Sequence, residues 1–95
     1  MIWKNSKFET LYYSKDIADT DWACTVRIDD DSILVEYDNE GLCQYIGKND
    51  GSGHFELHLK DGDGRATLHR FPDSLVLEGS WVENGQRGMW RVLLE

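Results

Sequence analysis

Three histidines and one glutamate are spaced so that they share one face of two predicted strands. His54, Glu56 and His58 alternate along the stretch HFELHL. A tight turn to the next strand places Glu56 opposite His69, so imidazole and carboxylate groups that bind zinc lie on one side of a hairpin. However, the Cα atoms of His54 and His58, four residues apart in a strand, are separated by about 13 Å. We therefore expect a solvated or ion-paired sheet face and no metal site.

Acidic side chains are a second candidate for chemistry. Residues 16–40 hold nine acids and one base, Arg27, and carry the whole net charge of −8. A one-sided negative surface suits a basic protein partner, and its long-range attraction weakens as salt is added. The alternative is that these acids favour turns and keep a small protein soluble. The candidate partner-binding residues are Asp29, Asp30, Asp31, Asp38 and Glu40.

Aromatic side chains are a third candidate. They make up 12% of the chain, with 4 Trp, 4 Tyr and 3 Phe. Large rings line small-molecule pockets but also dominate ordinary cores, so each indole is expected either in the core or in the wall of a ligand cavity. The candidate ligand-binding residues are Trp22, Tyr37, Tyr45, Trp81 and Trp90, with Tyr12 beside them.

The usual catalytic arrangements are absent from the sequence. It contains no nucleophile elbow, no Walker loop, no dinucleotide fingerprint and no His-Glu-x-x-His motif. Cys43 has no electropositive neighbour in the sequence that would activate its thiolate. The stretch 61–64 (DGDG) lacks the further oxygen ligands of a calcium loop. We expect a non-enzymatic protein without a cofactor.

Length and composition predict a single domain over residues 1–95. A chain of 95 residues has room for one core, and its 40% of hydrophobic residues exclude a disordered chain. The negative charge argues against nucleic acid or an anionic membrane as a partner. No apolar run reaches the roughly 18 residues of a membrane span, and no signal-peptide stretch follows Met1. Cys24 and Cys43 are expected to be buried thiols in a cytoplasmic protein, with a bridge between them left open.

Period-two alternation extends over nearly the whole chain, and helical spacing is almost absent. Clusters of Asp, Asn and Gly between the alternating stretches are typical of hairpin turns. A single helical turn fits only residues 14–20. Eight strands are predicted, over 7–13, 21–28, 32–37, 41–47, 53–60, 64–71, 74–83 and 86–94.

The last two predicted strands have a well-specified register. An Asn-Gly turn at 84–85 suits a two-residue type I′ hairpin. This turn pairs Trp81 with Gly88 and Gly79 with Trp90, so that each indole covers a glycine of the facing strand.

The strands over 21–28 and 32–37 pair in the same manner. Val26 is expected opposite Val35, and Cys24 opposite Tyr37. Each hairpin then has one apolar and one mostly polar face, as in an antiparallel sheet that covers a core.

Consecutive antiparallel strands with short turns are best accommodated by closure, which removes unpaired edges. The predicted fold is all-β, a single antiparallel eight-stranded meander closed or nearly closed into a small barrel. In Gly79-x-Trp81 and Gly88-x-Trp90 on consecutive late strands, the chain resembles the calycin-like superfamily of avidin-like and lipocalin-like barrels. The resemblance covers about 20 residues and the architecture. It implies a non-enzymatic small-molecule-binding barrel with the ligand at the interior or mouth.

Two functions from different classes therefore stay open. Ligand binding ranks first because a cavity follows from barrel closure. The alternative is an acidic protein-binding inhibitor or adaptor, of the immunity or phage anti-defence type, that captures a basic partner surface. A filled interior would argue against the first function, and an unclosed barrel edge would favour the second.

Overall fold

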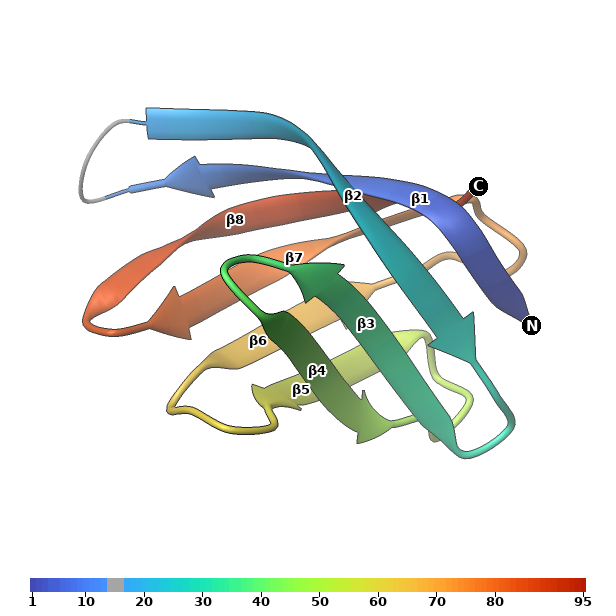
Figure 1. Ribbon diagram of the computed structural model, residues 1–95. Coiled ribbons are helices and arrows are strands. Elements are labelled where there is room, and N and C mark those ends of the chain that lie inside the picture. The colour runs from blue at the N-terminus through green and yellow to red at the C-terminus, as the bar shows by residue number, and fades with distance from the viewer. Residues whose placement is uncertain (14–16) are drawn as a thin grey trace.

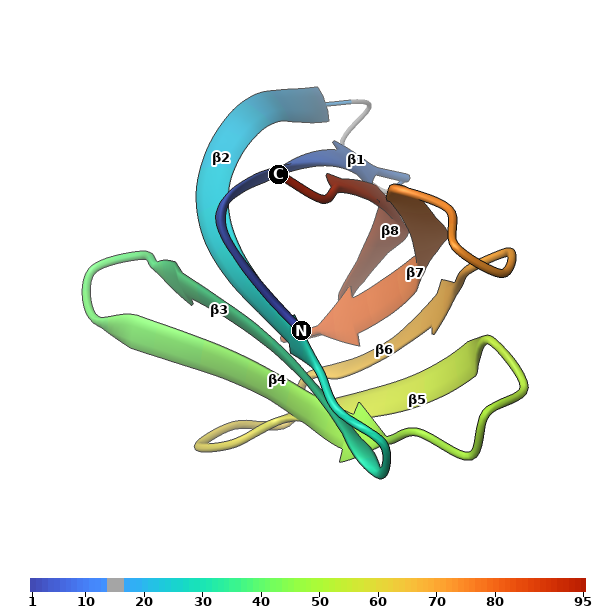
Figure 2. The same cartoon turned by 90° about the vertical axis from the view of Figure 1, so that its right-hand side faces the viewer.

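The computed structural model describes residues 1–13 and 17–95 and shows an all-β fold (Figure 1). The strands are β1 (Ile2–Tyr12), β2 (Ile17–Ile28), β3 (Ser32–Asp38), β4 (Leu42–Lys48), β5 (His54–Leu59), β6 (Arg65–His69), β7 (Val76–Glu83) and β8 (Gln86–Leu93). Each strand pairs antiparallel with its neighbours in the chain, and β8 pairs with β1. The strands therefore wrap around a common interior (Figure 2), and the predicted closed eight-stranded barrel is confirmed. The described residues include no helix, and so none that could cross a bilayer.

The hairpin of β1 and β2 is longer than predicted. β1 begins at Ile2, before the predicted start at residue 7. The first part of the strand was not predicted because a register shift between Trp3 and Ser6 breaks the alternation that marks a strand in the sequence. The helical turn expected over 14–20 is wrong for residues 17–20, where β2 pairs with β1; residues 14–16 lie outside the described residues. The partner strand provides a hydrogen-bonding ladder there, and pairing overrides the weak local preference.

The predicted register of β7 and β8 is confirmed. Trp81 faces Gly88 and Gly79 faces Trp90. Asn84 and Gly85 both have positive φ, at 52° and 76°, as a type I′ turn requires.

Two register predictions fail elsewhere in the barrel. The β2–β3 ladder contains Val26 opposite Val35 as expected, but it ends at Thr25 and Glu36, so the predicted pair of Cys24 and Tyr37 is not part of it. In the β5–β6 hairpin, Glu56 lies opposite Thr67 and not His69.

The failed β5–β6 register can be followed at the turn. The hairpin closes one residue earlier on each strand than predicted, where Leu59 N–H donates to the Gly64 carbonyl at 3.0 Å. The next N–H, that of Lys60, donates to the carbonyl of Gln44 on β4 at 2.9 Å. The turn is therefore displaced along the chain, and the facing residues shift by two.

The core fills the part of the barrel away from the β7–β8 turn. Its most deeply buried side chains are branched aliphatic residues that alternate inward along their strands. Two polar side chains of β1 are also buried, and both are hydrogen bonded. Ser6 Oγ donates to the Trp3 carbonyl and accepts from the Glu95 N–H, while Thr10 Oγ1 donates to the Met89 carbonyl. The most deeply buried aliphatic residues are Val26, Ile33, Val35, Leu68, Leu77 and Val92.

The two cysteines are free thiols. Cys24 is buried as predicted, but the same prediction is wrong for Cys43, which is only half-buried on β4.

Candidate functional site

The barrel opens between β2 and β3. Their ladder ends at Thr25 and Glu36, but β2 continues along β1 as far as Ile17, and β3 continues along β4 as far as Asp38. Asp21 in β2 has a φ of 63° beside a register shift, and Figure 1 shows β2 bending away from β3. A positive φ in a non-glycine residue at a shift is typical of a β-bulge, which bends a strand. The two strands therefore diverge and leave a mouth at this end.

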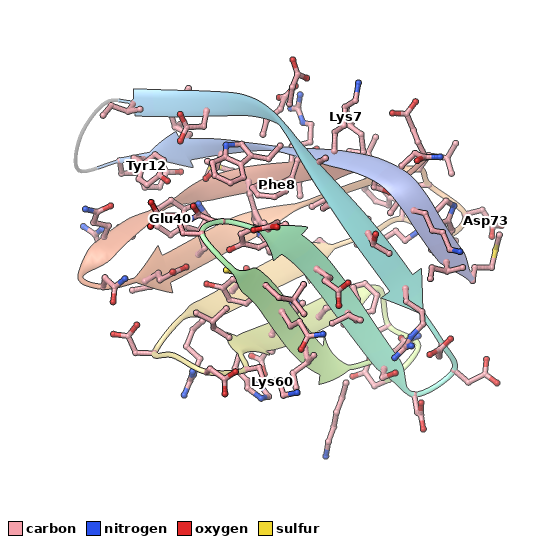
Figure 3. The ribbon with its side chains drawn as sticks, viewed as in Figure 1. Lys7, Phe8, Tyr12, Glu40, Lys60 and Asp73 are labelled. Atoms are coloured by element: carbon pink, nitrogen blue, oxygen red, sulfur yellow. The ribbon has the colours of Figure 1, made fainter. Side chains whose placement is uncertain are left out.

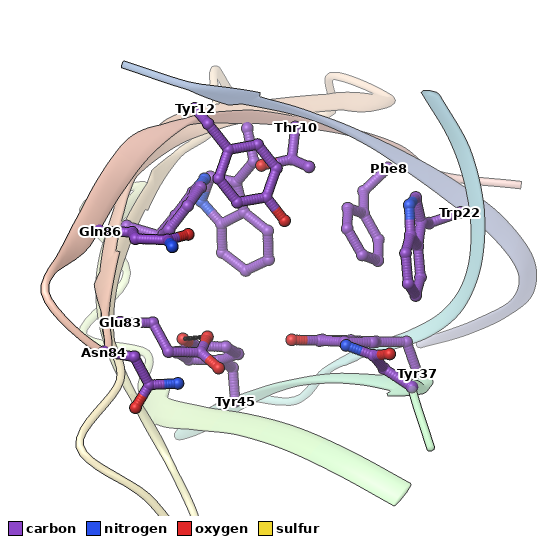
Figure 4. Close-up of a pocket in the computed structure, with 12 residues that line it drawn as sticks. Phe8, Thr10, Tyr12, Trp22, Tyr37, Tyr45, Glu83, Asn84 and Gln86 are labelled. Carbon is purple, nitrogen blue, oxygen red and sulfur yellow. Dashed lines mark hydrogen bonds between the residues drawn. The ribbon is translucent and has the colours of Figure 1, made fainter. Parts of the chain in front are cut away.

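A pocket of about 240 Å³ occupies this mouth (Figure 4). All five candidate ligand-binding residues from the sequence line it, and so does Tyr12. The structure thus brings together aromatic residues from six of the eight strands. The complete lining is Phe8, Thr10, Tyr12, Trp22, Tyr37, Asn39, Tyr45, Trp81, Glu83, Asn84, Gln86 and Trp90.

The aromatic rings contact one another around the pocket. Phe8 stacks on Trp22 with ring centroids 5.8 Å apart, and Tyr37 meets the edge of Phe8 at 5.0 Å. Tyr45 lies 5.6 Å from Trp90, and Tyr12 meets Trp81 at 4.8 Å. Such edge and offset contacts stabilise the positions of the rings around the pocket.

Trp81 and Trp90 lie both in the core and in the lining of the pocket. Both indoles are buried, and their ring nitrogens donate to backbone carbonyls of Met89 and Thr67, at 3.2 and 3.0 Å. A buried indole N–H with a partner belongs to the core. The same rings form part of the pocket lining, so core and pocket are continuous.

Two glycines allow these indoles to lie so close to the neighbouring strands. A Cβ at Gly88 would overlap the Leu11 carbonyl of β1 and touch the ring of Trp81. A Cβ at Gly79 would overlap the Thr67 carbonyl, which is the acceptor of the Trp90 indole. The Gly-x-Trp spacing therefore has a packing reason in this barrel.

Polar groups also reach the pocket. The Tyr45 hydroxyl donates to Glu83 Oε2 at 2.8 Å. Figure 4 shows the hydroxyls of Tyr12 and Tyr37 and the carboxylate of Glu83 turned toward the open centre. The pocket therefore presents both aromatic rings and phenol and carboxylate oxygens to its centre.

The three phenols remain protonated over a wide pH range. Burial, and then the hydrogen bond to Glu83, raise the pKa of Tyr45 far above its usual range. Burial and the charge of Glu83 likewise raise the pKa of Tyr37. Burial, followed by the charges of Asp19 and Glu83, raises the pKa of Tyr12. All three hydroxyls can thus donate or accept hydrogen bonds at neutral pH.

Sequence reasoning missed several lining residues. Phe8 and Thr10 share the inward face of β1 with Tyr12, whereas Lys7 points away from the barrel (Figure 3). This period of two was the signal that could have found them. Glu83 and Gln86 flank the Asn-Gly turn, where the sequence pattern indicated only hairpin geometry.

The candidate partner-binding acids lie in two separate places. Residues 29–31 form the β2–β3 turn, whereas Asp38 and Glu40 lie at the other end of β3, about 20 Å away for a strand of 7 residues (Figure 1). Asp29 is also partly neutralised, since its carboxylate lies 3.1 Å from Arg27 Nε. These acids therefore do not form one continuous surface.

The histidines are arranged differently from the prediction. His54 and His69 face each other, with Nδ1 of His54 2.7 Å from Nε2 of His69. Glu56 lies 3.9 Å from the other ring nitrogen of His54. Within residues 1–13 and 17–95, no group of three or more His, Cys, Asp or Glu side chains is placed to hold a metal ion.

Comparisons with protein-family models, with curated proteins and with solved structures give no match to this chain. What the chain has in common with the calycin-like barrels that it resembles is the general shape, a closed antiparallel barrel of eight strands.

Proposed function

We propose that this protein is a non-enzymatic, calycin-like barrel that binds a small molecule in the pocket at its mouth. One observation carries the proposal. Seven aromatic rings from six strands surround a space of about 240 Å³ in a chain of only 95 residues. A concave pocket walled mainly by rings with a few polar groups is typical of a ligand site.

The lining supports binding more than catalysis. Apart from the tyrosines, Thr10 is the described lining residue with a hydroxyl, and this hydroxyl donates to the Met89 carbonyl. Among the described lining residues there is no Ser, Cys, His or Lys, so the commonest pairs of nucleophile and base are not present. The polar groups that face the centre are suited to orient a bound molecule.

The alternative function, capture of a basic protein, is less supported. Closure of the barrel gives every strand two neighbours, so the open edge is limited to the part of β2 beyond the end of its ladder with β3 at Thr25. The acids proposed for it lie at the two ends of β3.

Native mass spectrometry on protein purified from its producing cell tests the proposal. We expect a native mass above that of the chain by a bound small molecule, which is lost on denaturation. Asn39→Trp places a bulky ring at the pocket mouth and should abolish the added mass. Asn5→Trp adds the same ring at an exposed position of β1 outside the lining and should retain it. A bare native mass, or an added mass that Asn39→Trp leaves unchanged, would contradict the proposal.

A further inference from the structure

We infer that the pocket takes a small organic cation, an alkylated ammonium ion, held by Glu83 and the surrounding aromatic faces. This inference rests on the proposed function, because it names the class of ligand for the same site. It depends on three features of the pocket: its charge, the nature of its walls and its size.

The described lining of the pocket carries a negative charge. This charge belongs to Glu83, and no Lys, Arg or His lines the pocket among the described residues. Asp19 and Asp63 add to the negative field, since their charges help to raise the pKa values of Tyr12 and Tyr45. An anionic ligand would be repelled by this field, and a cation would be attracted to it.

Glu83 is free to accept further hydrogen bonds or a charge. Its Oε2 accepts from Tyr45, and no other hydrogen bond reaches its side chain within residues 1–13 and 17–95. A carboxylate has about four lone-pair sites. Figure 4 shows the Glu83 carboxylate at the edge of the open centre, facing the side where Phe8 and Trp22 lie.

The aromatic walls suit an alkylated cation better than a hydrated ion. Cations within about 6 Å of a ring centroid are attracted by the electron-rich face, most strongly at Trp and Tyr. Phe8 and Trp22 lie on one side of the centre, and Tyr37 and Tyr45 lie on another. The methyl groups of an alkylated ammonium ion also bury apolar surface against such rings, which is favourable. A metal ion has no apolar surface to bury.

The size of the pocket limits the ligand to a small molecule. Its volume of about 240 Å³ lies below the range of about 300–1,000 Å³ that is typical of sites for drug-sized ligands. Choline is a correspondingly small alkylated cation, and 3,3-dimethylbutan-1-ol has the same shape with carbon in place of the charged nitrogen. The two probes therefore separate charge recognition from shape and apolar contact.

Titration of ¹⁵N-labelled protein with each probe tests the inference. The chain has 4 Trp, whose indole N–H signals report separately. We expect choline to shift the signals of Trp22 and of the buried pocket indoles, and to leave Trp3, which is outside the lining, unchanged. The neutral analogue should bind about tenfold or more weakly than choline.

Matched variants identify the source of the charge preference. Glu83→Gln should lower the affinity for choline about tenfold and leave that for the neutral analogue unchanged. Glu78→Gln makes the same change of charge on the same strand, outside the lining, and should alter neither affinity. If Glu83→Gln fails to fold, Trp22→Leu should weaken choline binding and Trp3→Leu should not.

Three results would overturn the inference: equal binding of the two probes, no effect of Glu83→Gln on choline, or no binding of either probe. Equal binding would leave the proposed function intact, because the pocket would still bind a small molecule. If neither probe binds, the native mass spectrum separates the two ideas. A co-purified uncharged molecule contradicts only the cation, and a bare chain contradicts both.

Discussion

The hydroxyl of Tyr45 on β4 donates a hydrogen bond of 2.8 Å to the carboxylate of Glu83 on β7, two strands that are not neighbours in the barrel. The bond therefore crosses the pocket end of the barrel over the intervening strands β5 and β6. A Cβ at Gly64, in the turn between those strands, would touch the Tyr45 hydroxyl. The glycine in the turn thus leaves room for the phenol, and the hydrogen bond holds the side chains of Tyr45 and Glu83 together at the pocket.

Loss of this bond should destabilise the protein. Tyr45→Phe removes the hydroxyl donor from a buried side chain, so the Glu83 carboxylate loses this hydrogen bond and is solvated by water instead. Hydrogen bonds to charged groups contribute more than neutral ones, so we expect the free energy of unfolding to fall by about 1–2 kcal/mol. Urea titration measures the change, and Tyr13→Phe, at a side chain that is 55% exposed, is the control. Equal stability of the two variants would show that the bond contributes nothing.

Gly88→Ala should be strongly destabilising. The added methyl would overlap the Leu11 carbonyl, which is backbone in the β1–β8 ladder, so the two strands must separate. Overpacking of this kind typically costs about 1–3 kcal/mol. Gly62→Ala is the matched control, because its methyl meets only the flexible end of the Leu59 side chain. Thermal unfolding of both variants checks this, and a melting temperature for Gly88→Ala as high as that of Gly62→Ala would refute the packing account.

Stability should fall at alkaline pH. The pKa of Tyr37 is raised in the folded state, mainly by burial. The unfolded phenol, with its pKa near 10, then ionises first, so stability is complete below about pH 10 and declines as the pH rises towards the folded pKa. One such group contributes a slope of at most about 1.4 kcal/mol per pH unit. Urea titrations at neutral and alkaline pH should show a shallower decline for Tyr37→Phe than for Tyr13→Phe, and parallel declines would argue against it.

The two thiols should differ in reactivity. Burial raises the pKa of Cys24 to about 12, so only a minute fraction is thiolate at neutral pH. Cys43 is half-buried, and burial raises its pKa as well. We expect iodoacetamide to label Cys43 slowly in the native protein and Cys24 only after unfolding. Peptide mass spectrometry with and without denaturant measures both sites, and native labelling of Cys24 at the rate of Cys43 would contradict the burial argument.

Local patterns in the sequence determined the strands and the best-defined hairpin. Alternation with a period of two identified eight strands, and the Asn-Gly turn at 84–85 fixed the facing residues of β7 and β8. A two-residue turn leaves a single register, because a slip would turn every side chain to the other face. The meander order then followed from short connections, and closure from the need to pair the edges.

The pocket residues were predictable only in part. The rings of Trp22, Tyr37 and Tyr45 belong to inward faces of predicted strands, so their convergence at one end followed from the meander. Phe8 was missed although it alternates with Tyr12, and Glu83 was missed because it flanks the Asn-Gly turn, where the sequence pattern indicated only hairpin geometry. A side chain's contacts across the barrel depend on strands distant in sequence.

Only the tertiary structure decided where the barrel opens. The divergence of β2 from β3 after Thr25 results from the pairing of β2 with β1 and the bulge at Asp21. The β5–β6 hairpin closes at Leu59 and Gly64, where the next N–H of β5, that of Lys60, bonds to Gln44 of β4. In both places the strand pairs with a neighbour on each side, so the residues that face each other depend on strands that are distant in the sequence. The sequence by itself therefore determined the strands, the closed order, the β7–β8 register and most of the rings, and the closed barrel decided the β5–β6 register, the mouth and the meeting of Tyr45 with Glu83.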